Sequence, residues 1–260
     1  MASSELLLMV FSIVDYYDLP FDLQQSQYRI IQKIADNMNE ARATDLIRRN
    51  GGLANLIKGF SSHNPRFQPI ITNLITKLVT LGRRSMDVRT LFALTSQTSN
   101  QALAGLKDVA LKLIVDLSEN KEEEKGGMNH RHLESEFENF IPHLIDMSKS
   151  PQKYPSDFVR ISALQTLANL ALRDYLRPQF FSHGAMELFI EVVRNQNASL
   201  NTVEAKRIAA KGLVNLVATR KDIRLQVVAD LAEEIKLIYR NQLDPVVASY
   251  IQTLLHVNDS

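Results

Sequence analysis

The chain has 260 residues, enough for one large domain or a short helical solenoid with a continuous core. Lys and Arg number 30 against 29 Asp and Glu, so the net charge gives no general attraction to nucleic acids or membranes. The sequence contains no cysteine, which excludes disulfides, thiolate metal sites and a cysteine nucleophile.

The first apolar segment covers residues 6–14, LLLMVFSIV. It is shorter than the roughly 20 residues that a helix needs to cross a bilayer. Asp15 and Asp18 follow it, and no basic region precedes it as in a signal peptide. We therefore predict no membrane span, and a helix over residues 1–23 that caps the N-terminal end of the core.

Beyond this segment, apolar residues recur with the 3.6-residue period of an amphipathic helix. The clearest runs lie within residues 30–35, 74–81, 109–117 and 208–217. Near the C-terminus, Asp244 before Pro245 is typical of a helix N-cap followed by Pro at the first helical position. Alternating strand patterns are scarce, so the predicted class is all-α.

A four-residue motif at the end of the expected helices recurs along the chain. LANL at 167–170 is matched by LVTL at 78–81, IVDL at 114–117 and LVNL at 213–216. To compare the repeats, we take the second residue of each motif as a reference position and add Ala35 from the first apolar run. The reference positions are then Ala35, Val79, Val115, Ala168 and Val214. They lie about 40 residues apart, the period of paired-helix repeats. The longest interval contains a charged segment, 119–134, which we interpret as an inserted loop within a single domain over residues 1–260.

A second motif lies between the two helices of a repeat. DLIRRNGGLANLI at 45–57 and QFFSHGAMELFI at 179–190 place a glycine, Gly51 or Gly184, where the chain must reverse between packed helices. Such a turn takes a residue with positive φ, which glycine adopts without a Cβ clash. With the helix endings above, these segments resemble the armadillo-repeat family over most of residues 24–257. The resemblance implies a right-handed helical solenoid of about five repeats.

Motifs for chemistry are absent from the sequence. It contains no phosphate-binding loop, no dinucleotide fingerprint, no GxSxG and no HExxH. His130 and His132 lie near Glu134, but residues two apart on a helix point to different faces. We therefore expect no metal site, no cofactor, no small-molecule substrate and no enzymatic activity.

The family resemblance also implies a binding site. In armadillo proteins, an asparagine near the end of the third helix of a repeat often pairs with the backbone of an extended peptide. The matching positions on the concave face of the expected solenoid are Asp36, Thr80, Asp116, Asn169 and Asn215. Only the last two are asparagine, and the chain has no Trp four residues earlier, so we do not expect recognition of basic import signals. The acidic side chains of Asp36 and Asp116 are compatible with a basic or amphipathic ligand.

The sequence therefore predicts a scaffold or adaptor that binds a protein or peptide and has no catalytic role. The alternative is a regulatory or targeting domain of a larger enzyme or complex. We do not expect a nucleic acid partner. The expected compartment is the cytoplasm, with the nucleus as the alternative.

Overall fold

The computed structural model describes residues 20–48, 68–82, 88–96, 104–119, 129–218, 221–239 and 243–256. Within these ranges every regular element is helical, which confirms the all-α class. None of the helices described there combines the length and the apolar character needed to cross a bilayer.

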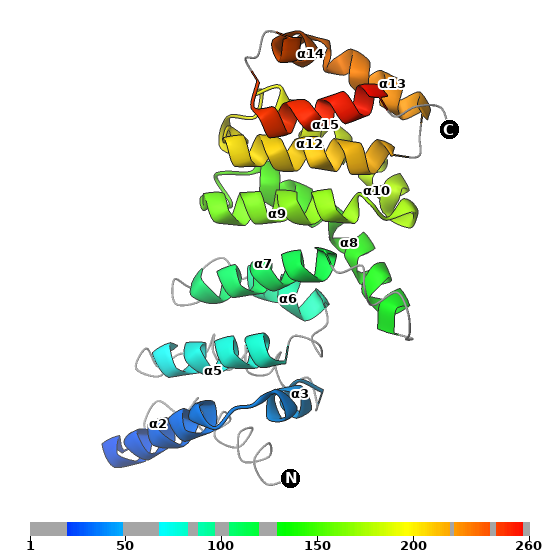
Figure 1. Ribbon diagram of the computed structural model, residues 1–260. Coiled ribbons are helices and arrows are strands. Elements are labelled where there is room, and N and C mark those ends of the chain that lie inside the picture. Colours follow the sequence, from blue (N-terminus) through cyan, green and yellow to red (C-terminus); the bar gives the residue numbers. More distant parts are fainter. Residues whose placement is uncertain are drawn as a thin grey trace. The chain divides into compact units, whose positions relative to one another are not determined.

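The chain forms two compact units, Met1–Leu113 and Ile114–Ser260. In the first unit, α5 packs against both α2 and α3 (Figure 1). Its helices are α2 (Phe21–Asp36), α3 (Glu40–Arg48), α5 (Gln68–Leu81) and α6 (Val88–Ser96), while α7 (Ala104–Glu119) crosses the boundary between the units. The prediction of one domain over the whole chain stays a prediction.

The second unit is built around three helices that pack in succession. Helix α9 packs on α12, and α12 packs on α15 (Figure 1). Helix α8 also packs on α9, and α11 packs on α12. The helices of this unit are α8 (Asn129–Lys149), α9 (Asp157–Leu170), α10 (Arg177–Ser182), α11 (Ala185–Val193), α12 (Val203–Val217), α13 (Lys221–Asp230), α14 (Ala232–Tyr239) and α15 (Pro245–His256), with 3₁₀ turns η4 (Asp174–Leu176) and η5 (Ala198–Leu200).

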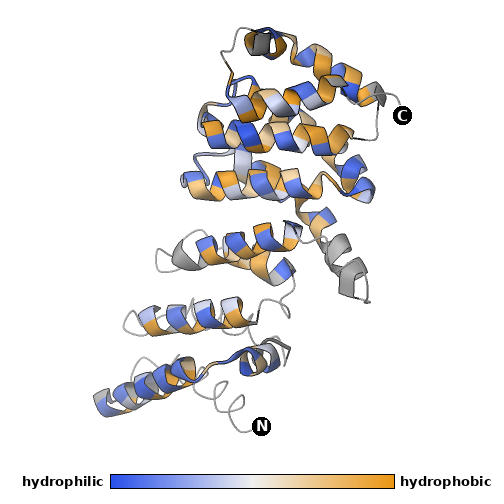
Figure 2. Ribbon diagram, viewed as in Figure 1, coloured by the Kyte–Doolittle hydropathy of each residue, from blue (hydrophilic) through white to orange (hydrophobic). Residues whose placement is uncertain are grey.

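The helices of this unit carry both hydrophobic and hydrophilic residues (Figure 2). The hydrophobic side chains of α9 and α12 include Leu167 and Leu213, which are completely buried. On α11, Phe189 is completely buried as well, and its ring lies against Gly212 of α12. The core of this unit therefore lies between the successive helices.

Local signals start and end several of these helices. The Thr202 hydroxyl accepts a hydrogen bond from the Ala205 amide at 3.1 Å and caps α12. Asp244 Oδ1 accepts from the Val246 and Val247 amides at 3.1 and 3.2 Å, so the predicted cap of α15 is confirmed. Between α10 and α11, Gly184 has a φ of 75°, the left-handed conformation for which the sequence suggested glycine.

The expectation of a loop over 119–134 is wrong at both of its ends. Helix α7 includes Glu119, and α8 begins at Asn129. His130, His132 and Glu134 are therefore on a helix. The rest of the expected loop, residues 120–128, lies outside the described residues, as do Gly51 and most of the expected capping helix over 1–23.

Candidate functional site

Asn169 lies at the centre of a polar network that joins α9 to its neighbours. Its Oδ1 accepts hydrogen bonds from Gln165 Nε2 at 2.8 Å and from Lys211 Nζ of α12 at 3.2 Å. Its Nδ2 donates to the hydroxyl of Ser118, at the end of α7, at 3.0 Å. One amide therefore connects α9 with α12 and with the part of α7 that belongs to the second unit.

Asn215 makes a different contact, with the end of α9. Its Nδ2 donates to the backbone carbonyl of Ala168 at 2.8 Å. A continuing helix would direct the Leu172 amide at that carbonyl, but this amide donates to Asn169 O instead, at 3.4 Å. The Asn215 side chain thus satisfies a carbonyl left open by the end of α9.

The first unit contains an equivalent contact. Lys77 of α5 donates from Nζ to the carbonyl of Ala35, near the end of α2, at 3.0 Å. Ala35 and Ala168 are equivalent reference positions of the sequence repeat. In each unit, a polar side chain of a later helix, α5 or α12, therefore reaches the carbonyl at this position.

These contacts correct the expected role of the two asparagines. We expected Asn169 and Asn215 to lie outside the core-facing side of their helices and to be open to a ligand. Their exposed fractions are only 4% and 9%, and both amides are bonded within the protein. Replacing them with Ala would leave buried partners unsatisfied and reduce stability, so that substitution does not test binding alone.

The other three predicted residues are exposed. Asp36 lies 3.7 Å from the ammonium of Lys77 in a solvent-accessible ion pair. The Thr80 hydroxyl donates to the carbonyl of Thr76 in its own helix at 2.8 Å. Asp116 is exposed on α7. Asp36 and Thr80 belong to the first unit, whereas Asp116 belongs to the second unit with the two asparagines. The role of the three exposed residues in partner binding stays a prediction.

A different surface is formed by one side of α9 together with one side of α12. A row of residues four apart on α12 is exposed at Val203 and Arg207 and half-buried at Lys211. A row on α9 is exposed at Phe158 and half-buried at Ile161 and Gln165, and the two rows meet at the Gln165–Asn169–Lys211 network. We name this surface the α9–α12 face. It consists of Phe158, Ile161 and Gln165 of α9 and of Val203, Arg207 and Lys211 of α12.

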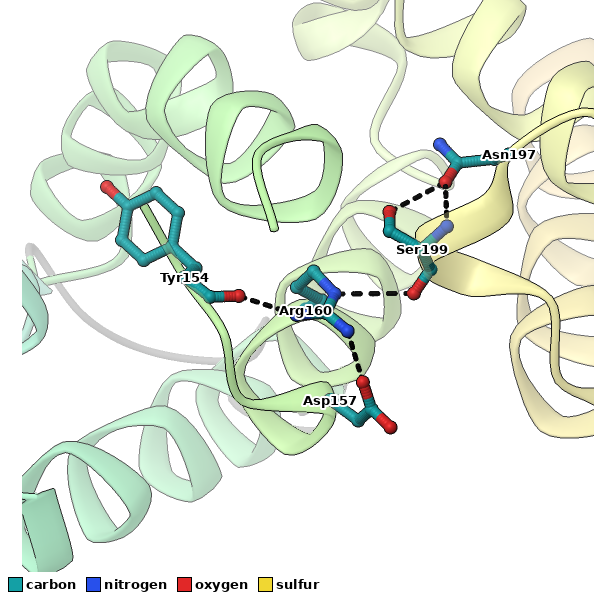
Figure 3. Close-up of polar contacts among 5 residues, drawn as sticks. All are labelled: Tyr154, Asp157, Arg160, Asn197 and Ser199. Atoms are coloured by element: carbon teal, nitrogen blue, oxygen red, sulfur yellow. Dashed lines mark hydrogen bonds and ion pairs between the residues drawn. The ribbon is translucent and has the colours of Figure 1, made fainter. Parts of the chain in front are cut away.

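Arg160, which the sequence analysis did not single out, fixes the start of α9. Its guanidinium donates to the carbonyl of Tyr154 at 2.6 Å and to that of Ser199 at 3.3 Å, and it pairs with Asp157 (Figure 3). Asn197 Oδ1 in turn holds Ser199, accepting from its amide at 3.1 Å and its hydroxyl at 2.7 Å. Only 5% exposed, Arg160 has a structural role: it ties α9 to both loops beside it.

Arg207 joins α12 to α15 at the edge of the α9–α12 face. Its Nε donates to Asp244 Oδ1 at 2.9 Å and its Nη2 to Oδ2 at 2.7 Å, a bidentate pair. The guanidinium, helped by the amides of Val247 and Val246, lowers the pKa of Asp244 from 3.8 to about 2. A carboxyl group whose pKa is lowered on folding stabilises the fold above its unfolded pKa, and that contribution is lost as pH falls toward the folded value.

We expect Asp244→Asn to lower the melting temperature at pH 6 and to have a shrinking effect between pH 4 and pH 2. Asn keeps an oxygen that can cap α15, so the substitution removes mainly the ion pair with Arg207. The measurement is the difference in melting temperature between the two proteins as a function of pH. An equal difference at pH 6 and pH 2.5 would show that the charge of Asp244 does not contribute.

No family model and no curated protein matches this sequence. In the described part of the chain, no group of three or more His, Asp or Glu side chains is arranged to hold a metal ion. Function is therefore inferred from the chain's own repeat and surfaces.

Proposed function

We propose that this protein is a scaffold or adaptor without catalytic activity that binds a protein or peptide through the α9–α12 face. We further propose that its helices belong to an armadillo-like solenoid of about five repeats and that it acts in the cytoplasm. The observation that carries the binding proposal is the α9–α12 face, a partly exposed surface whose polar side chains are bonded within α9, between α9 and α12, and between α12 and Asp244.

The repeat architecture is supported by contacts at equivalent positions. The carbonyl of Ala35 accepts a hydrogen bond from a side chain of α5, and the carbonyl of Ala168 accepts one from a side chain of α12. The two contacts lie in separate units of the chain. The succession of α9, α12 and α15 has the order expected for stacked repeats, each of which packs on its neighbours. Both features follow the sequence period of about 40 residues.

Binding at the α9–α12 face is supported by the mixture of side chains there. Val203 is 53% exposed, and Phe158 near the start of α9 is also exposed, so apolar surface is available to a partner. Lys211 and Gln165 are both bonded to Asn169, which reduces the conformational entropy that they lose when a partner binds. Exposed apolar surface beside ordered polar groups is typical of protein-binding surfaces.

We expect Val203→Glu to abolish capture of the partner by the tagged protein, with no loss of fold. Val203 is the first residue of α12, where a carboxylate is favoured by the helix dipole, so the variant should keep its melting temperature. The measurement is affinity capture from extracts of the source cells, with bound proteins identified by mass spectrometry. Leu225→Glu is the matched control, because Leu225 is 59% exposed and lies on α13, outside this face.

If Val203→Glu retains a partner that Leu225→Glu loses, the binding site lies on α13 and not on the α9–α12 face. That result is expected for a regulatory domain that docks on another part of a complex. Capture of no specific partner by the wild-type protein would contradict the scaffold proposal itself.

A further inference from the structure

Asn169 has no acceptor capacity left for a ligand. A side-chain amide oxygen has two lone pairs, and here both are used, by Gln165 Nε2 and by Lys211 Nζ. A peptide backbone therefore cannot donate its N–H group to this asparagine unless the network breaks. The groups that remain at this point of the α9–α12 face are mainly donors, since Lys211 uses one of its three N–H groups on Asn169.

Lys211 also carries a positive charge, and no carboxylate of the described residues forms an ion pair with it. Within the described residues its one polar contact is the bond to Asn169. The nearby cation Arg207 is already paired with Asp244 through two bonds. Because Lys211 is half-buried and its ammonium is held by the amide, its charge occupies a fixed position on α12.

None of the described acidic side chains pairs with Lys211, although Asp116 and Glu119 lie on either side of Ser118, the α7 partner of Asn169. Asp157 at the start of α9 pairs with Arg160. Glu204 lies on the same helix as Lys211 but two turns earlier, about 10 Å along the axis. The α9–α12 face thus offers one cation that pairs with no described carboxylate, with an exposed valine on the same row.

We propose that the α9–α12 face binds an extended acidic peptide segment, with Lys211 pairing with one of its carboxylates. This inference rests on the proposed function and names the chemistry of its partner. Val203 lies two turns before Lys211 on α12, about 12 Å along the axis. An extended chain covers that distance in about four residues. The partner segment therefore carries an acidic residue and an apolar residue about four positions apart.

The test uses three pools of fluorescein-labelled decapeptides. Each pool has a fixed Leu and, four residues away, either Glu, Gln or Lys, with equal mixtures of Ala, Ser and Gly elsewhere. Fluorescence anisotropy titrations with the wild-type protein should show about tenfold tighter binding of the Glu pool than of the Gln pool, as for one charge-assisted hydrogen bond. The Lys pool should bind more weakly than both.

Variants of Lys211 separate a local pairing from general attraction between charges. Lys211→Glu should reverse the order, so that the Lys pool binds best, and Lys211→Gln should remove the preference for Glu. Lys206→Glu is the matched control: it changes the net charge equally at a half-buried position outside the α9–α12 face and should keep the wild-type order. Melting temperatures identify variants whose fold has changed. If Lys211→Glu unfolds, the test depends on Lys211→Gln, which keeps a donor for Asn169 and should bind the Glu and Gln pools equally.

Two results would overturn the inference and leave the proposed function standing. One is binding of peptides without a preference for Glu, and the other is an equal effect of Lys206→Glu and Lys211→Glu. If the wild-type protein binds none of the pools, the inference fails. The proposed function then fails only if the wild-type protein also captures no specific partner.

Discussion

Replacing Leu167 or Leu213 with Ala should lower the free energy of unfolding by about 2–5 kcal/mol. Both side chains are completely buried, Leu167 on α9 and Leu213 on α12. Truncation removes the transfer free energy of three carbon atoms and leaves a cavity. The helices cannot close it easily, because each packs on neighbours along its length. The measurement is chemical denaturation of each variant, followed by circular dichroism.

The control for this prediction is Leu225→Ala. Leu225 is the same residue type in the same unit, but it is 59% exposed on α13. Its truncation should change the free energy of unfolding by less than about 0.5 kcal/mol. Equal effects at the buried and exposed positions would contradict the assignment of Leu167 and Leu213 to the core.

Elements defined by local chemistry could be predicted from the sequence. The cap of α15 depends on Asp244 and on amides two and three residues later. The turn before α11 depends on one residue, Gly184, and its positive φ. The apolar period likewise located the ends of α9 and α12 close to the repeated motifs at 167–170 and 213–216. In each case the determining contacts span only a few residues.

The burial of Asn169 and Asn215 could not be predicted in this way. A helical period places each asparagine about 100° from the residue before it, but does not say how wide the buried sector is. Helix α9 packs against α8, α12 and η5, and α12 packs against α9, α11, α13 and α15. With neighbours on several sides, only a narrow row stays exposed, and the positions beside that row become bonded contacts between helices.

Arg160 was missed for a related reason. Its partners include the carbonyl of Ser199, which is 39 residues away in the chain. Nothing in the sequence around Arg160 indicates that the loop between α11 and α12 returns to the start of α9. An arginine among apolar residues of a predicted core helix is nevertheless a usable signal, because a buried guanidinium needs several acceptors.

Gly212→Ala should lower the free energy of unfolding by about 1–3 kcal/mol, although alanine is the better helix former. A Cβ at position 212 would lie 2.7 Å from Phe189 Cζ and 2.9 Å from both Cε atoms. The Phe189 ring is completely buried, so it cannot turn aside without displacing other core side chains. The gain in helix propensity, about 1 kcal/mol, is smaller than the expected cost of overpacking.

A double-mutant cycle with Phe189→Leu separates these two effects. Leucine lacks the Cε and Cζ atoms that the new methyl group would meet, so it removes the clash while keeping an apolar side chain. In the Phe189→Leu background, Gly212→Ala should therefore be neutral or stabilising by up to about 1 kcal/mol, which is the propensity term alone. The same destabilisation in both backgrounds would mean that glycine is needed for the backbone of α12 itself. A coupling of about 2 kcal/mol or more would instead assign the requirement to the close packing of α11 on α12.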